Sequence, residues 1–366
     1  MNCVLRAVSL NILFLVCFVL LYRQYNIAGL VTFYVVGIVI VFLSWSLPYR
    51  IKLNRLPSIT NRRVKPIFVG FTFILFSIVI AYLRGINIFD LLAVFSDREA
   101  FVATQDGMGF IFIVYFEIFF GFWLANFFLG KLSIFQLFLI VLLFTVLSFS
   151  RAYFFYLLVA YIVNMNFNLR NIIGISVFFI LSCSILLLRF NTVDIGILLN
   201  NPVVIELFTK YPFVGIARLG VDEPVTLSYY NYFTAWIMPF DFLSFGTLEN
   251  LFHLDKGSIS YSRFVGNSLV DFKELPILSS GELSSFNAFG TLFYPFKFFS
   301  YFSFIYLFIV SLLNSLIFKL IGVDKNQAYR VLSFLLIAGI LISLFNTLVI
   351  IGILLGYYFS LKTSDV

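Results

Sequence analysis

One arginine stands where an apolar segment begins, a position from which it could hold a phosphate. Arg151, in SFSRAYFF, directly precedes a run of apolar residues. If a helix begins there, Ser150 can cap it, and free backbone N–H groups, the positive helix end and the guanidinium converge on one point. That arrangement suits a phosphate at the level of lipid headgroups. The alternative is an arginine whose aliphatic stem lets its charge reach the membrane surface.

Three further arginines could contribute to such a site. Arg98, in SDREAFVATQDGMG, is followed by Gly107 and Gly109, which either let the backbone approach a ligand closely or turn the chain. Arg218, in GIARLGVDE, and Arg263, in SYSRFVGNS, lie beside glycines farther along the chain. Guanidinium forks bind pyrophosphate and sugar carboxylates in bidentate fashion. The alternative for the last two is solvation or pairing with local acids.

A general base has three candidates. His253 has a suitable unperturbed pKa, although a lone loop histidine is usually incidental. It is the single histidine of the chain, so His-paired metal motifs are excluded. Glu117 lies inside an apolar stretch, where an acid marks either a functional position or a pair with a neighbouring helix. The adjacent acids Asp222 and Glu223 are the third candidate.

The elements that position these residues are strongly apolar. Hydrophobic residues make up 62% of the 366 positions and charged residues only 11%, whereas a soluble domain carries about a quarter charged residues. Most of the surface must therefore face lipid. A membrane span needs roughly 20 apolar residues. The sequence accordingly predicts an all-α, polytopic integral membrane protein with about ten transmembrane helices, near 7–22, 27–47, 66–83, 109–129, 132–149, 152–167, 171–188, 298–319, 331–346 and 347–361.

Two features at the ends of this pattern need interpretation. The first helix is expected to be retained, because no small-residue cleavage pattern follows it. The stretch 331–361 is continuously apolar and exceeds the length of an ordinary span. It forms either one long tilted helix or a hairpin broken near Asn346-Thr347, and the hairpin is the preferred interpretation.

Basic residues predict the orientation of the helices. The segment 48–66 contains basic residues and no acid, which is typical of a cytoplasmic loop. Counting helices from it places both termini inside. The cytoplasmic set then includes Arg6, Arg50, Lys52, Lys131, Arg170, Lys319, Lys325, Arg330 and Lys362.

The same count predicts three parts of one integrated domain. Residues 1–188 contain seven transmembrane helices and an exterior loop at 84–108. Residues 189–297 form a long exterior loop with short helical or re-entrant segments, and 298–366 contain three more helices. Most acids fall in the two exterior loops, so chemistry is expected on that face.

Around SFSRAYFFYLLVAYIV the chain resembles the bacterial O-antigen polymerases, the Wzy-type oligosaccharide repeat-unit polymerases, and the related O-antigen ligases. The resemblance extends to Arg98 with its downstream glycines, to LSYYNYFTAWIMPF (227–240) and to FNAFGTLFYPF (286–296). The chain departs from the family at 293–300, where FYPFKFFS replaces an expected Asp-x-Gly.

The resemblance implies an enzyme of the bacterial inner membrane. It would take undecaprenyl-pyrophosphate-linked oligosaccharide on the periplasmic face, join the repeat units and release undecaprenyl pyrophosphate. It implies no cofactor, no obligatory metal and no nucleic acid. A chain-length regulator and a flippase are the implied partners, besides membrane lipid. Arginines at the outer face could stabilise the leaving group without a metal.

Several alternatives remain open. An O-antigen ligase would share the fold and the donor and differ in the acceptor. Another lipid-linked-sugar glycosyltransferase is disfavoured because the first exterior loop, LYRQYN, has no carboxylate. An O-acyltransferase is disfavoured by the late position of His253. A non-enzymatic flippase or transporter predicts short, even loops, which the loop 189–297 contradicts. A membrane scaffold would leave the exterior arginines unexplained.

Overall fold

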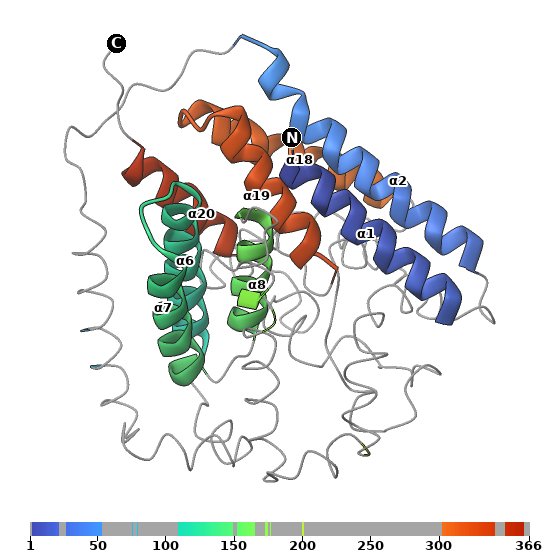
Figure 1. The fold of residues 1–366 in the computed structure, drawn as a ribbon. Coiled ribbons are helices and arrows are strands. Elements are labelled where there is room, and N and C mark those ends of the chain that lie inside the picture. Colours follow the sequence, from blue (N-terminus) through green and yellow to red (C-terminus); the bar gives the residue numbers. More distant parts are fainter. Residues whose placement is uncertain are drawn as a thin grey trace, which may run out of the picture.

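The computed structural model describes residues 2–21, 27–52, 109–148, 152–164, 302–340 and 348–361, together with the isolated positions 75, 79, 173, 174, 176 and 200. All regular structure in these ranges is helical (Figure 1). The elements are α1 (Asn2–Leu21), α2 (Ile27–Ser46), η1 (Pro48–Arg50), α6 (Gly109–Phe128), α7 (Ile134–Ser148), α8 (Ala152–Asn164), α18 (Ser303–Leu320), α19 (Lys325–Ala338) and α20 (Leu348–Ser360). The predicted all-α class is confirmed for this part of the chain.

Three of the described helices are long and apolar enough to cross a membrane. They contain the segments Cys3–Leu20, Val31–Arg50 and Ser303–Leu320. Shorter apolar helices cover Glu117–Phe128, Tyr153–Asn164 and Val349–Ser360. The predicted helices at 66–83 and 171–188 lie largely outside the described residues. The predicted exterior loops at 84–108 and 189–297 also lie outside them, apart from Asn200.

The apolar stretch 331–361 contains two helices, α19 and α20, and is not one long helix. The predicted start of the first one, at 331, is wrong. Helix α19 begins at Lys325 because the side chain of Asp324 caps it, accepting a 2.9 Å hydrogen bond from the Gln327 backbone N–H. The first turns are polar, so a search for apolar runs passes over them.

Helices α6 and α20 pack with their backbones in contact. A Cβ atom added to Gly121 would lie 2.1 Å from the carbonyl oxygen of Val349, and one added to Gly352 would lie 2.1 Å from that of Ile118. A Cβ on Gly356 would meet the Ala125 side chain at 2.6 Å. Small residues at four-residue spacing on both helices therefore allow this approach, as they do in membrane helix pairs.

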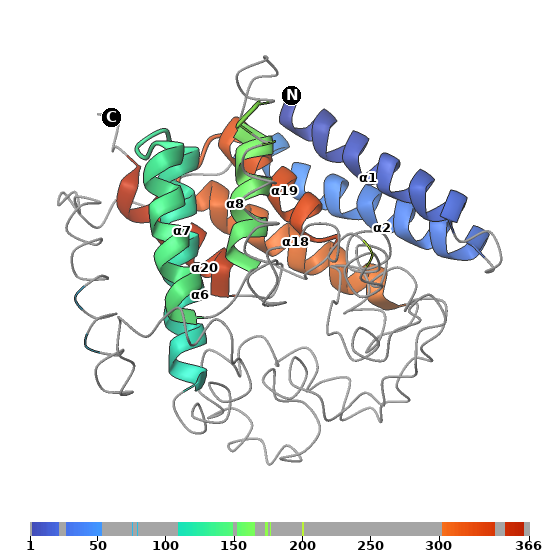
Figure 2. The ribbon, with the colours of Figure 1, turned by 60° about the horizontal axis from the view of Figure 1, so that its bottom comes forward.

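The described helices run in two main directions. Helices α6 and α7 lie side by side, while α1, α2 and α18 cross them at a marked angle (Figures 1 and 2). Helix α18 packs along α2, α1 packs along α19, and α8 contacts both α7 and α19.

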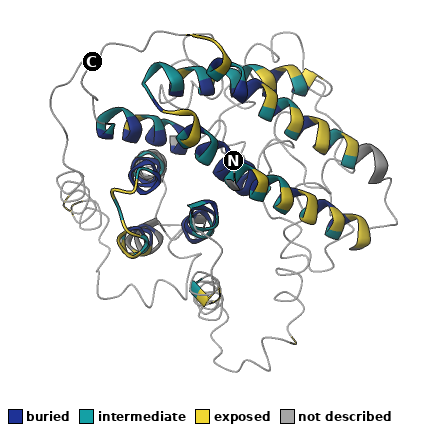
Figure 3. Ribbon diagram, turned by 45° about the horizontal axis from the view of Figure 1, so that its top comes forward, coloured by how far each residue is buried: buried dark blue, intermediate teal, exposed yellow. Residues whose placement is uncertain are grey.

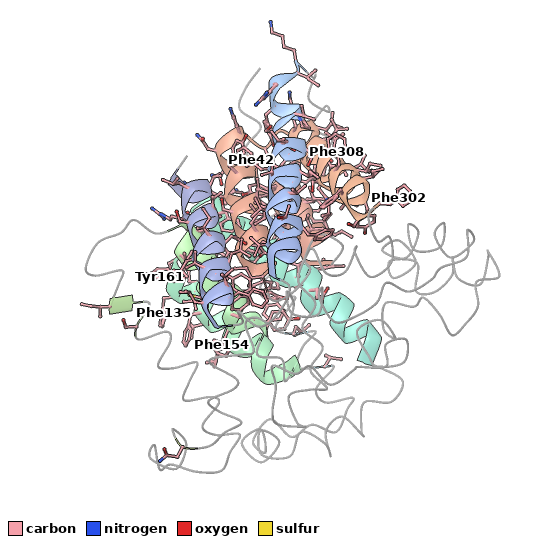
Figure 4. The ribbon with its side chains drawn as sticks, turned by 90° about the vertical axis from the view of Figure 1, so that its right-hand side faces the viewer. Phe42, Phe135, Phe154, Tyr161, Phe302 and Phe308 are labelled. Carbon is pink, nitrogen blue, oxygen red and sulfur yellow. The ribbon has the colours of Figure 1, made fainter. Side chains whose placement is uncertain are left out.

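The exposed residues of α1 and α2 lie on the outer side of the assembly (Figure 3). Phe302 and Phe308, at the start of α18, project outward (Figure 4). Such apolar outer faces suit contact with lipid.

Candidate functional site

Of the residues singled out from the sequence, Glu117 is the one that the structure describes. It lies on α6 and is half-buried. The remaining candidates lie outside the described residues: Arg98, Arg151, Arg218, His253 and Arg263, with the acidic pair Asp222 and Glu223. The geometry of a candidate site can therefore be built from Glu117 and its neighbours.

Glu117 on α6 lies near the first turn of α8. Phe120, one turn after Glu117, packs against Tyr153 of α8 with ring centroids 5.2 Å apart, and the charge of Glu117 acts on the Tyr153 hydroxyl. Tyr153 is buried and belongs to the first turn of α8. In the sequence it follows Arg151 by two positions. Contact between α6 and α8 thus places Glu117 near the start of the helix that Arg151 precedes.

An aromatic cluster surrounds the Tyr153 ring. The ring of Phe120, one turn after Glu117 on α6, lies 5.2 Å from that of Tyr153 and 5.5 Å from that of Tyr156. The Phe144 ring of α7 lies 5.4 Å from that of Tyr153. One carboxylate oxygen of Glu117, Oε2, is itself buried. Charge–dipole interactions are stronger in such a low-dielectric setting than in water.

Helices α7 and α8 pack against each other. The Phe138 and Phe154 rings are 6.2 Å apart and the Phe144 and Tyr153 rings are 5.4 Å apart, so two levels of α7 contact the first turn of α8. Helix α7 ends at Ser148 and α8 begins at Ala152. This is the helix hairpin on which the expectation for Arg151 depends, although Arg151 itself lies outside the described residues.

Four basic side chains bind the C-terminal ends of neighbouring helices at one end of the assembly. Each donates a hydrogen bond to a backbone carbonyl, where the negative end of a helix favours a cation. The pairs are Arg6 with Ile162 of α8, Lys131 with Ser360 of α20, Lys319 with Pro48 and Ile51 after α2, and Arg330 with Phe128 of α6. We call the end of the assembly that carries these four basic side chains the basic end.

The basic end gathers residues that the sequence analysis assigned to one side of the membrane. It brings the C-terminal ends of α2, α6, α8 and α20 together with the N-terminal ends of α1 and α19. These helix directions agree with the alternation that the sequence predicted. Glu117 and Tyr153 lie away from this end, because Glu117 is in the first half of α6 and Tyr153 begins α8.

Two buried polar contacts were missed by the sequence analysis. Tyr34 of α2 donates to the side-chain oxygen of Asn11 on α1 at 2.9 Å, and Asn11 donates to the Ala7 carbonyl at 2.8 Å. Ser360 of α20 donates to the side-chain oxygen of Asn126 on α6 at 2.9 Å. The available signal was a polar residue inside an apolar run, which marks a helix contact as readily as a site.

The described residues form an all-helical structure with helices fit to span a membrane, and Glu117 lies near the contact between two of the helices. No protein-family model matches the chain, and no curated protein or solved structure matches it.

Proposed function

We propose that this chain is an O-antigen polymerase, a membrane glycosyltransferase that joins undecaprenyl-pyrophosphate-linked oligosaccharide repeat units and releases undecaprenyl pyrophosphate. One observation supports the proposal most strongly: Glu117 lies one helical turn from Phe120, whose ring contacts Tyr153, and Tyr153 is two positions after Arg151 in the sequence. An acid and an arginine near one helix start supply both charges that such a transfer needs. The resemblance around SFSRAYFF supports the same activity.

The reaction moves one glycosyl group between two oxygens. The acceptor hydroxyl attacks the anomeric carbon, a new glycosidic C–O bond forms, and the anomeric C–O bond to pyrophosphate breaks. The bond electrons leave with undecaprenyl pyrophosphate, and the acceptor proton passes to a base. Glu117 is the base candidate in the described part of the chain, and His253 is the alternative.

Stabilising the departing pyrophosphate is the task proposed for the arginines. Arg151 would bind it at the start of α8, and Arg98, Arg218 and Arg263 would contribute from the exterior loops. Fixed guanidinium groups aimed at charge that develops in the transition state lower the barrier without a metal ion.

The proposal includes a location and a topology. The chain would cross the bacterial inner membrane with about ten helices, with both termini in the cytoplasm and the loop 189–297 in the periplasm. The basic end would then face the cytoplasm, as its arginines and lysines favour. A chain-length regulator and a flippase would be its partners.

Deletion and complementation test the activity. The deletion strain should make lipopolysaccharide that carries a single repeat unit and no ladder of longer chains. Wild-type chain and the lipid-facing control Leu139→Ala should restore the ladder, whereas Glu117→Gln should not at equal membrane level. Loss of every repeat unit from the deletion strain would favour a ligase or a flippase, and an unchanged ladder would contradict all three activities.

A further inference from the structure

We propose that Arg50, Lys325 and the hydroxyl of Tyr329 form a binding site for the phosphate headgroup of an anionic phospholipid at the basic end. The site is separate from Glu117 and Tyr153 and does not depend on the proposed polymerase activity. It is built where the segment after α2 meets the start of α19.

Hydrogen bonds of Lys319 and Tyr49, which we call the Lys319 joint, hold the backbone around Arg50. The Lys319 ammonium on α18 donates to the carbonyls of Pro48, at 2.5 Å, and of Ile51, on either side of Arg50. It also lies 5.9 Å from the centre of the Tyr49 ring. The Tyr49 hydroxyl donates at 3.3 Å to the carbonyl of Val323, which immediately precedes the cap of α19. The backbone around Arg50 is therefore held against the turn between α18 and α19.

Tyr329 lies beside Lys325 and packs against α2, the helix that leads to Arg50. Its ring stacks on Phe42 of α2, with centroids 5.9 Å apart and ring planes 29° from parallel. The Lys325 ammonium lies 5.8 Å from the centre of the same ring, and Arg50 is close enough to act electrostatically on its hydroxyl. Burial raises the pKa of Tyr329, with Arg50 opposing this shift. The phenol therefore stays protonated at neutral pH and can donate a hydrogen bond.

The charges of the site match a phosphodiester. Arg50 and Lys325 are exposed, and Lys52 adds a third exposed cation. The neighbouring acid, Asp324, uses its carboxylate to cap α19, accepting from the Gln327 backbone N–H. Positive charge remains in excess. A guanidinium fork, an ammonium and a phenolic O–H can together satisfy the anionic oxygens of one phosphate.

The surroundings favour a lipid over a free phosphate. Val39 and Leu43 of α2 are exposed by 48% and 49%, and Ile317 of α18 is exposed by 42%. These apolar side chains belong to the two helices that the Lys319 joint connects, and α2 leads directly to Arg50. A phospholipid can place its acyl chains along this surface while its phosphate lies at the joint. Basic groups at the membrane surface attract anionic lipids in this way.

Native mass spectrometry of the full-length chain in detergent can measure binding of phosphatidylglycerol and of phosphatidylcholine. The double variant R50Q/K325Q should bind phosphatidylglycerol about tenfold more weakly, because two charge-assisted contacts are lost. Tyr329→Phe keeps the ring contacts and removes only the hydroxyl, so it should show a smaller loss and tests the site even if the double variant fails to fold. Binding of phosphatidylcholine should stay the same throughout.

The matched control is Lys131→Gln, which removes a cation from the same end of the assembly without touching this site. Wild-type affinity for phosphatidylglycerol in R50Q/K325Q and in Tyr329→Phe would overturn the proposal. An equal loss in Lys131→Gln and in the double variant would show general charge attraction and would also overturn it. Displacement of phosphatidylglycerol by glycerol 3-phosphate at equal concentration would assign the site to soluble phosphates instead of a lipid.

Discussion

Arg330 donates from Nη1 to the backbone carbonyl of Phe128 at 3.0 Å, across 202 positions of the sequence. That carbonyl ends α6, where the chain turns through Gly130 at a φ of 71°. The negative end of α6 is thereby fixed to the N-terminal part of α19. Because α6 also packs on α20, and α19 on α1 and α8, this hydrogen bond adds a polar link between helices that α8 also bridges by contacting α7 and α19.

Arg330→Gln should lower the stability of the chain. The substitution removes a hydrogen bond from a charged group, so the free energy of unfolding should fall by about 1.5 to 3 kcal/mol. Unfolding of the purified chain in mixed detergent micelles measures the loss. Lys52→Gln removes one charge from an exposed position at the same end and should leave stability within about 0.5 kcal/mol. Equal stability of the two variants would show that the Arg330–Phe128 contact contributes nothing.

Gly352→Ala should push α6 and α20 apart. The new Cβ would meet the Ile118 carbonyl, a backbone atom that cannot move aside without moving the helix. Overpacking of this kind costs about 1 to 3 kcal/mol. The control is Leu355→Ala on the same helix, because Leu355 is exposed by 37% and faces away from close contact. The same unfolding assay should rank Gly352→Ala as the less stable variant, and the reverse order would contradict the observed packing.

Asn11 and Tyr34 should be energetically coupled. The Tyr34 hydroxyl donates to the Asn11 side chain in the apolar interior, and Asn11 donates onward to the Ala7 carbonyl. Polar contacts between membrane helices contribute about 0.6 kcal/mol on average. A double-mutant cycle with Tyr34→Phe and Asn11→Ala should return a coupling energy of that order. Strict additivity of the two single substitutions would exclude an interaction between them.

Helices with uninterrupted apolar runs were predictable from the sequence. The predicted helices at 27–47 and 109–129 match α2 and α6 almost to the residue. The start of α19 was missed because its first turns are polar and its cap, Asp324, lies outside the apolar run. A local search for apolar length does not register a helix that begins in the polar layer and then enters the interior.

The candidate site was predictable only in its parts. Glu117 stood out as an acid in an apolar helix, but the contact of α6 with Tyr153 follows from the way α6 and α8 pack. The Gly352-x-x-x-Gly356 spacing is present in the sequence but was not identified there as a packing motif. Its partners, Gly121 and Ala125, lie more than 200 positions away, and a single sequence carries no signal for that pairing.

Reporter fusions should confirm the proposed topology. Fusions at Thr60 and Lys325 are expected to report the cytoplasm, and fusions at Thr104 and Ser260 the periplasm. The reason is the density of basic residues between 50 and 65. A periplasmic signal at Thr60 would reverse the whole orientation. A cytoplasmic signal at Ser260 would remove the long loop from the proposed active face.

Arg151→Lys should impair chain elongation almost as much as Arg151→Ala. The donor's pyrophosphate gains localised charge as its glycosidic bond breaks, and a planar guanidinium at a helix start can bind two of its oxygens at once. Lysine keeps the charge but loses that bidentate geometry. Removing one such contact typically costs about 100-fold or more in rate, equivalent to about 3 kcal/mol. Complementation of the deletion strain, with membrane levels checked by blot, measures the effect in lipopolysaccharide ladders. If Arg151 only extends its charge to the membrane surface, lysine will substitute freely. A full ladder from Arg151→Ala at normal protein level would exclude Arg151 from the site.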